Sequence, residues 1–548
     1  MKPFNKKVLW IFLAVLVLGT FLRLLGINKP EGLWNDEYVS WYVASIPFGK
    51  EFINQVFAQC HMPFYYLYLK FFMNFGQSDL ALRLSSVFAG MLSIVVMYFV
   101  GREFKNKRLG IFCAIFTAIS SFLIYYSQEV RMYEVLFLIS AFSLLYTLKL
   151  VKNPKPHKIF LYFLSLFLIL FTHTIGFVYV FFSLFFVSYM LINKNVKYKK
   201  TISSLWIFII LGFLVFSPLT FKIFTESSYS QWWGHFTFSK ILFLISDYFS
   251  PVLTSLVNAP DNFFYNFSTK FFIFAILPSL LAIYGTYRAI RTGKTEALGL
   301  FLVVLGTLSV LSIAAAFGKM VFITKYSIEI YPILITIFCF GISEVNNRKW
   351  KYFLALSFCF IQLLYLFTMP DSAIKRVRTE GHKLAADLIL GAELKKGDFV
   401  LLEYYPKERF ERYFDFEGLN VISINKGNFS QYLTDKELVK DKIEIKKQAR
   451  EIFSANESNY FDKKLKKEIF QKMKKGQKIS VIFLNSVSMI SPNNLKKIAF
   501  DDKAYEKTPF LFSVFSYLKN ETIESMLTEL KPVKLEQKGS WLCATFKK

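Results

Sequence analysis

The sequence contains little cysteine, and its cysteines follow no metal-binding pattern. Three of the five lie inside apolar runs, where cysteine behaves as a small hydrophobic residue. Their spacing is not that of a zinc site, so they indicate no metal centre and say little about the redox compartment. The five are Cys60, Cys113, Cys339, Cys359 and Cys543.

Acidic residues are also few relative to basic ones, with 39 Asp and Glu against 66 Lys and Arg, which gives a formal charge of +27. In a soluble protein this excess would suggest a nucleic-acid partner. However, 54% of the residues are hydrophobic, 65 are Phe, and the mean hydropathy is +0.38. These values exclude an ordinary soluble chain. Basic residues then fit loops at the cytoplasmic face of a membrane, so we expect a lipid bilayer and no nucleic acid as partner.

Apolar segments long enough to cross a bilayer, which takes about 20 residues, recur along the chain. The first follows three lysines and lacks a small-residue cleavage site, so it is predicted to be an uncleaved signal anchor. The eleven predicted spans are 8–27, 82–100, 109–126, 132–150, 159–175, 176–192, 203–219, 271–287, 298–316, 321–341 and 352–369.

The charge of the connecting segments predicts the orientation. Five alternate connections are all basic, whereas loop 28–80 has five acidic residues against three lysines and loop 220–270 has three of each. Because positive residues favour the cytoplasmic side, the N-terminus is predicted inside and residues 371–548 outside a plasma or inner membrane. The basic connections are 101–108, 152–158, 193–200, 287–294 and 346–351.

Residues 371–548 differ from the transmembrane domain predicted for 1–370, because they are rich in Lys and Glu. Amphipathic helices alternate there with short apolar strands, which predicts a small α/β domain outside the membrane. The domain lacks a Gly-rich phosphate loop and a nucleophile elbow, so we expect the chemistry elsewhere. The predicted elements are helices at 381–390 and 462–477 and strands at 399–405 and 479–485.

Ionisable and aromatic residues gather at the predicted outer ends of the spans. Charged groups at membrane depth are costly, and by default they indicate a functional site. The stretches are WNDEY (34–38), CHMPFYYLYLK (60–70), YYSQEVRMYE (125–134), FTHTIG (171–176) and FITKYS (322–327).

In this order the stretches resemble those of the GT-C class of polytopic membrane glycosyltransferases. The resemblance is to the branch of dolichyl-phosphate-mannose protein mannosyltransferases and lipid A aminoarabinose transferases, and it covers about the first 175 residues. A weaker likeness lies at TKYSIEIYPIL (324–334). This chain departs from the family's pattern at Met62, where Pro is usual, and at Lys325, where Arg is usual.

The resemblance implies transfer of a sugar from a polyprenyl-phosphate carrier to a protein, lipid or polysaccharide acceptor outside the cytoplasm, by inverting displacement. It implies catalysis by the pair Asp36 and Glu37 in the loop 28–80, with Asp36 as the base. Arg131 is the first candidate for the donor phosphate, followed by Lys325 and Arg23. The other predicted substrate-binding residues are His61, Glu129, Tyr133 and His173.

Several of these residues have structural alternatives. Glu37 could hydrogen-bond to the donor sugar, bind a metal or brace its loop. Arg131 could pair with Glu129, and Arg23 could extend from the first span to the headgroups. His61 could cap a helix, and His173 could be a packed, hydrogen-bonded side chain.

A metal is not predicted as a required cofactor. His and carboxylate side chains are common ligands, so Glu37, His61, His173 and His235 could meet around a divalent ion. Their separation along the sequence matches no ligand signature.

The competing hypothesis is a transporter or flippase for a lipid-linked or anionic substrate. Such proteins often carry Gly- or Pro-broken spans at matching places in two halves. No such pair of interruptions occurs here, and the polar stretches gather at one face. The sequence therefore favours a mainly helical glycosyltransferase.

Overall fold

The chain forms two compact units in the computed structural model, and the division falls inside one helix. The first, called the membrane unit below, comprises Met1–Asn28 and Val39–Arg376. The second, the C-terminal unit, comprises Lys29–Tyr38 and Val377–Lys548. The residues described are 6–59, 62–194, 199–226, 248–249, 277–294, 296–317, 324–368, 372–376, 381–403, 407–424, 469–484, 530–538 and 541–548.

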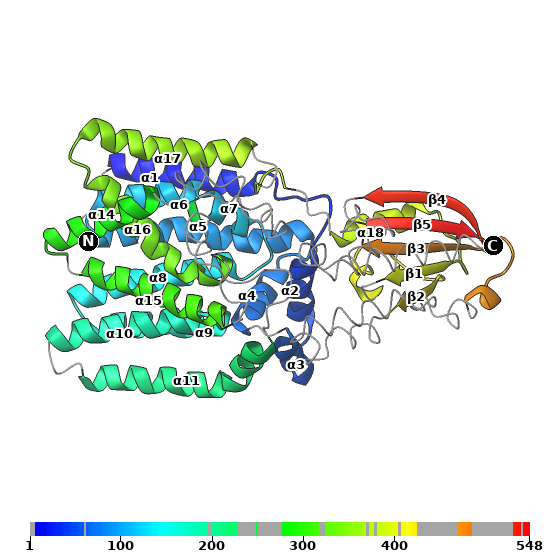
Figure 1. Ribbon diagram of the computed structural model, residues 1–548, viewed down its shortest axis with the longest axis horizontal. Helices are drawn as coiled ribbons and strands as arrows, with labels where there is room; N and C mark the ends of the chain where they lie inside the picture. The colour runs from blue at the N-terminus through cyan, green and yellow to red at the C-terminus, as the bar shows by residue number, and fades with distance from the viewer. Residues whose placement is uncertain are drawn as a thin grey trace, which may run out of the picture. The chain divides into compact units, whose positions relative to one another are not determined.

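The membrane unit is built from helices (Figure 1). Between the first two long helices lie three short ones, α2, α3 and α4, so the loop predicted after the first span is itself helical. Its elements are α1 (Lys6–Leu24), α2 (Asn35–Ser45, shared with the C-terminal unit), α3 (Lys50–Ala58), α4 (Phe64–Met73), α5 (Asp79–Phe104), α6 (Lys107–Ile119), α7 (Ser121–Ser127), α8 (Tyr133–Lys152), α9 (Pro156–Thr172), α10 (Gly176–Lys194), α11 (Lys199–Glu226), α14 (Leu277–Arg291), α15 (Glu296–Ala316), the 3-10 helix η3 (Thr324–Ile330), α16 (Tyr331–Ser343) and α17 (Arg348–Thr368).

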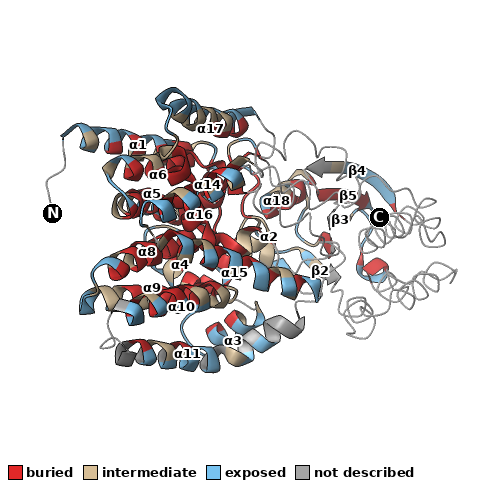
Figure 2. Cartoon of the chain, turned by 60° about the vertical axis from the view of Figure 1, so that its left-hand side comes forward, coloured by how far each residue is buried: buried red, intermediate tan, exposed pale blue. Residues whose placement is uncertain are grey.

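Burial differs strongly between these helices. In an apolar 18-residue stretch of Thr324–Ser343, 89% of the residues are buried, against 22% in such a stretch of Arg348–Thr368. Figure 2 shows α17 exposed along its outer side and the elements near α5 and α16 largely buried. The exposed side chains of α17 include Leu356 and Phe360, which are large and apolar. An apolar outer surface around a buried interior suits lipid as the solvent, so the chain is a multi-pass membrane protein.

The predicted count of eleven spans is not confirmed. Within the described residues, seven helices are long and apolar enough to cross a membrane, or eight if α6 and α7, which are bent by 57° at their junction, count as one. Helices do occur at the other three predicted spans. Of these, α9 and α14 have only 17 and 15 residues. Helix α11 contains the shorter apolar segment Leu205–Leu214.

Two glycines let α14 and α16 approach closely. A Cβ atom on Gly341 would lie 2.1 Å from the carbonyl oxygen of Leu281, and one on Gly285 would lie 2.6 Å from that of Ile337. Both contacts are with backbone, which cannot move aside as a side-chain tip can. Small residues at such crossings are typical of packed membrane helices.

The C-terminal unit contains a mixed five-stranded sheet in the order β2-β1-β3-β5-β4. Strand β1 pairs in parallel with β2 and β3, whereas β5 pairs antiparallel with β3 and β4. The elements are α18 (His382–Gly391), β1 (Phe399–Glu403), the 3-10 helix η4 (Lys407–Arg409), β2 (Asn420–Ile424), β3 (Lys478–Leu484), β4 (Lys531–Lys538) and β5 (Trp541–Lys547).

Both faces of this sheet are covered, which explains the unbroken apolar run in β1. Phe399 and Leu401 point into one buried cluster with Ile469 and Phe470. Val400 and Leu402 point into a second cluster, which includes residues of α18. Successive side chains of a strand face opposite sides, so a strand covered twice is apolar throughout.

The small α/β domain predicted from the sequence is therefore confirmed. The expected helix at 381–390 is α18, and the expected strands at 399–405 and 479–485 are β1 and β3. The helix expected at 462–477 falls mainly outside the described residues, which begin again at 469.

The glycine contact generates a stability prediction. Gly341→Ala should lower the free energy of unfolding by roughly 1–3 kcal/mol, because the new methyl group would overlap a backbone carbonyl. Gly212→Ala in α11 is the matched control, since a Cβ there meets nothing within 4 Å. Melting temperatures of the two purified variants would be compared in one detergent. Equal melting temperatures would contradict the proposed close contact.

His382 generates a pH prediction for the C-terminal unit. Burial, with a smaller contribution from Arg409, lowers the pKa of His382 from 6.5 to about 3. The unfolded chain therefore binds more protons than the folded chain between these values. Stability should be full above pH 6.5 and fall on acidification, by roughly 2 kcal/mol at pH 5.

The measurement is the protease resistance of the C-terminal unit in the full-length protein between pH 5 and 7. His382→Phe removes the titrating group and should flatten this dependence. Identical pH slopes for wild type and variant would show that His382 is not the responsible group.

Candidate active site

The acidic pair lies at the beginning of α2. Asp36 and Glu37 occupy the first turn, where the helix dipole favours negative charge. Glu37 is 1% exposed, and its Oε2 accepts a hydrogen bond of 3.4 Å from the Trp34 backbone N–H. This contact reaches back from the third helical residue to the residue before the helix, as in a capping box. The contact is consistent with the alternative in which Glu37 braces its own loop. Asp36 is half-buried.

The far end of α2 is held by a lysine of α4. Lys70 Nζ donates to the carbonyl oxygens of Ala44 and Ile46, at 2.9 and 2.6 Å. The last carbonyls of a helix have no partner within it, and a cation there is favoured by the dipole. Lys70 therefore fixes the end of the helix that begins with the acidic pair.

Two predicted phosphate ligands converge in the membrane unit. The Arg131 guanidinium lies 5.8 Å and Lys325 Nζ 5.4 Å from the centre of the Tyr133 ring. Arg131 lies in the turn before α8, and Lys325 lies in η3. Arg131 is 5% exposed and Tyr133 is 1% exposed. The ring attracts both cations through its electron-rich face.

His173 joins the same place from the end of α9. Its ring centre lies 6.4 Å from that of Tyr133 and 5.4 Å from that of Tyr326. Its Nδ1 lies 3.6 Å from Oε1 of Glu329, which is 1% exposed. Together these side chains form what we call the Tyr133 cluster: Arg131, Tyr133, His173, Lys325, Tyr326 and Glu329.

Four members of this cluster are predicted site residues, whereas Tyr326 and Glu329 were not predicted. The signal for Glu329 was available, because it is an acid inside an apolar segment predicted to be a span, and such acids usually have a function or a partner.

Glu129 forms an ion pair with Arg376, with 3.1 Å between Nη1 and Oε1. Arg376 also lies 3.6 Å above the centre of the Tyr125 ring. Arg131, which the sequence offered as another partner for Glu129, donates from Nη1 to Ser40 Oγ at 3.4 Å. Glu129 thus pairs with an arginine near the end of the membrane unit, a residue that no sequence motif indicated.

Arg23 is completely buried inside the membrane unit and does not extend to the headgroups. It donates to Ser127 Oγ and to the backbone carbonyls of Gly19, Thr117 and Ala118, at 3.0–3.1 Å. Two of these carbonyls end α6, where the chain bends into α7. Arg23 therefore satisfies polar groups that the bend leaves without helical partners. Its place indicates a structural role.

His61 and His235 lie outside the described residues. Among the residues that are described, no three His, Cys, Asp or Glu side chains gather closely enough to hold a metal ion.

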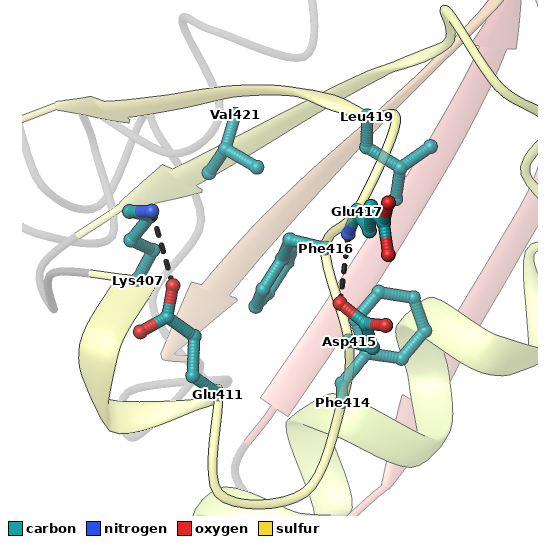
Figure 3. Close-up of a pocket in the computed structure, with 8 residues that line it drawn as sticks. All are labelled: Lys407, Glu411, Phe414, Asp415, Phe416, Glu417, Leu419 and Val421. Carbon is teal, nitrogen blue, oxygen red and sulfur yellow. Dashed lines mark hydrogen bonds and ion pairs between the residues drawn. The ribbon is translucent and has the colours of Figure 1, made fainter.

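A cavity of about 560 Å³ occurs in the C-terminal unit (Figure 3). It contains an ion pair of 3.0 Å between Lys407 and Glu411, and Asp415 Oδ1 accepts a hydrogen bond from the Glu417 backbone N–H. None of the predicted site residues lines it, so we do not place the active site there. Its lining residues are Lys407, Glu411, Phe414, Asp415, Phe416, Glu417, Leu419 and Val421.

Comparison with known proteins adds to this geometry. A family model described as dolichyl-phosphate-mannose-protein mannosyltransferase matches residues 60–221. No curated protein sequence matches the chain.

Solved structures resemble the chain over almost its whole length. ArnT from Cupriavidus metallidurans in the apo state superposes with a TM-score of 0.52 at 12% identity, covering 99% of this chain and 98% of ArnT. ArnT bound to undecaprenyl phosphate superposes with a TM-score of 0.48 at 11% identity, covering 98% of this chain and 97% of ArnT. The Archaeoglobus fulgidus oligosaccharyltransferase in complex with Zn and sulfate superposes with a TM-score of 0.48 at 11% identity, covering 98% of this chain and 88% of the oligosaccharyltransferase.

At these identities the likeness to apo ArnT shows the fold. Together with the family model over residues 60–221, it confirms the resemblance to the GT-C glycosyltransferases that the ordered sequence motifs predict.

Proposed function

We propose that the protein is an integral-membrane glycosyltransferase that moves a sugar from a polyprenyl-phosphate-linked donor to an acceptor on the extracytoplasmic side. The observation that carries the proposal is the Tyr133 cluster, in which two cations from separate segments lie 5.8 and 5.4 Å from the centre of one ring. The matching family model, named for a dolichyl-phosphate-mannose-dependent transferase, supports a lipid-phosphate donor. The positive-inside charge pattern supports the orientation.

In this proposal Arg131 and Lys325 bind the donor phosphate. The leaving group is a phosphate monoester, which needs charge stabilisation more than protonation as its bond to the sugar breaks. Arg131 is almost fully buried, so its charge acts in a medium that screens it weakly. The two cations supply the positive charge that a metal would otherwise provide, and the proposal therefore includes no required metal.

Asp36 is the proposed base. It takes the proton of the acceptor hydroxyl while that oxygen attacks the anomeric carbon and the bond from this carbon to the phosphate oxygen breaks. The products are the glycosylated acceptor, with inverted configuration, and the polyprenyl phosphate. Glu37 braces the helix start, and Glu329 beside His173 would orient that imidazole towards the donor.

The test of the function is transfer from radiolabelled polyprenyl-phosphate sugars by the full-length protein in membranes, with a cell extract as acceptor source. Asp36→Asn should reduce transfer at least about a hundredfold, the scale expected for loss of a general base. Glu51→Gln, an exposed acid in the same loop, is the control and should leave transfer unchanged.

Each outcome decides a different point. Equal transfer by Asp36→Asn and wild type would keep the enzyme and remove Asp36 as its base. No transfer from any donor by well-folded protein would contradict the glycosyltransferase and favour transport of a substrate without chemistry.

The charge of residue 325 provides a separate prediction. Lys325→Gln and Arg131→Gln should each reduce transfer at subsaturating donor by about 10- to 100-fold, the equivalent of one charge-assisted hydrogen bond. Lys325→Arg preserves the charge and should retain most activity, because arginine also suits phosphate geometry. Exposed Lys50→Gln is the control. Equal losses in Lys325→Arg and Lys325→Gln would show that the charge is not what matters.

A further inference from the structure

The segment that carries the acidic pair belongs to the C-terminal unit, although it directly follows the first membrane helix in the sequence. Residues Lys29–Tyr38 group with Val377–Lys548. Both backbone groups of Leu33 bond to that unit. Its N–H donates to the Tyr413 hydroxyl at 2.8 Å, and its carbonyl accepts from the His382 N–H at 3.3 Å.

Two glycines allow this close contact. Gly32 has a φ of +77°, and a Cβ there would lie 2.8 Å from both the Tyr413 hydroxyl oxygen and Lys383 Cβ. A Cβ on Gly381 would lie 2.2 Å from the carbonyl oxygen of Glu31. A side chain at either position would separate the segment from its support. The contact is thus built into the sequence on both sides.

An arginine of the C-terminal unit contacts residues on both sides of the acidic pair. Arg409, at the end of η4, donates to Oδ1 of Asn35, the residue before Asp36. Its guanidinium also lies 5.5 Å from the centre of the Tyr38 ring, the residue after Glu37. The Tyr38 ring in turn meets the edge of His382, with 5.4 Å between ring centres.

We propose that Arg409 and Tyr413 are positioning residues that fix the first turn of α2, which carries the acidic pair. The inference rests on the proposed function, because it gives these contacts a purpose only if Asp36 acts as the base. A base must lie within hydrogen-bond reach of the proton that it removes, and a displacement of about 1 Å can cost about 100-fold in rate. Arg409 and Tyr413 act through Leu33 and Asn35, without touching the substrate.

The competing explanation is that these contacts only stabilise the C-terminal unit. The two explanations differ in kinetics. A positioning role lowers kcat and leaves the KM for the donor unchanged, because the donor phosphate is bound elsewhere. A purely structural role lowers the amount of folded protein and leaves kcat per folded molecule unchanged.

The experiment measures kcat, donor KM and melting temperature for full-length protein in nanodiscs. Tyr413→Phe removes one hydroxyl, and Arg409→Gln removes the charged donor. Each should lower kcat by about 10- to 100-fold with donor KM within about twofold of wild type. Arg409→Lys should recover part of the loss, because lysine can still donate to Asn35. Lys407→Gln is the matched control in the same short helix, where Lys407 is exposed and pairs with Glu411.

A double-mutant cycle tests the route through Asp36. If Tyr413 acts by placing that carboxylate, Tyr413→Phe should have no further effect on the residual activity of Asp36→Asn. Independent, multiplying losses would overturn the proposal, as would full kcat in both Tyr413→Phe and Arg409→Gln.

A second measurement needs no enzymatic activity. Amide hydrogen exchange at residues 33–40 should be faster in Tyr413→Phe and Arg409→Gln than in wild type and Lys407→Gln, because the first turn of α2 loses its support. Unchanged exchange would overturn the positioning role. Faster exchange in a protein without any transfer activity would keep the contact and reject the proposed function instead.

Discussion

Helix α2 is the constraint on which the proposed active site depends, because it carries Asp36 and belongs to both units. Its beginning groups with the C-terminal unit, where Arg409 donates to Asn35. Its end groups with the membrane unit, where Lys70 donates to the carbonyls of Ala44 and Ile46. Each set of contacts holds its own end of α2 within its own unit. In the proposal, the contacts at the beginning of α2 place the carboxylates before substrate arrives, and such preorganisation is a large part of what an enzyme contributes to rate.

Buried charge in the membrane unit has two different uses. Arg23 donates to backbone carbonyls and one hydroxyl, so its charge serves to satisfy the bend between α6 and α7. Arg131 and Lys325 both lie near the ring of Tyr133, which attracts cations, and Arg131 also donates to Ser40 Oγ. An ionisable residue at membrane depth is therefore a weak predictor by itself.

Local patterns in the sequence predicted what local physics determines. Hydropathy located the long helices, and short apolar runs located β1 and β3. The ordered motifs led to Arg131, Tyr133, His173 and Lys325, which the fold brings together. The missed features all depend on contacts between distant segments. No local pattern shows that Arg23 ends up between helix ends, or that residues 29–38 join a sheet domain encoded at the other end of the chain. The antiparallel strands β4 and β5 were also not predicted, because β5 pairs with β3, a strand distant in the sequence.

The way in which this segment is held suits a base. The contacts of the C-terminal unit described above act on the residues around the acidic pair, through the backbone of Leu33, the amide of Asn35 and the ring of Tyr38. Contacts of this kind fix where a carboxylate lies without using its oxygens. Glu37 is buried and caps the helix, whereas Asp36 is half-buried, and the proposal therefore assigns the base to Asp36.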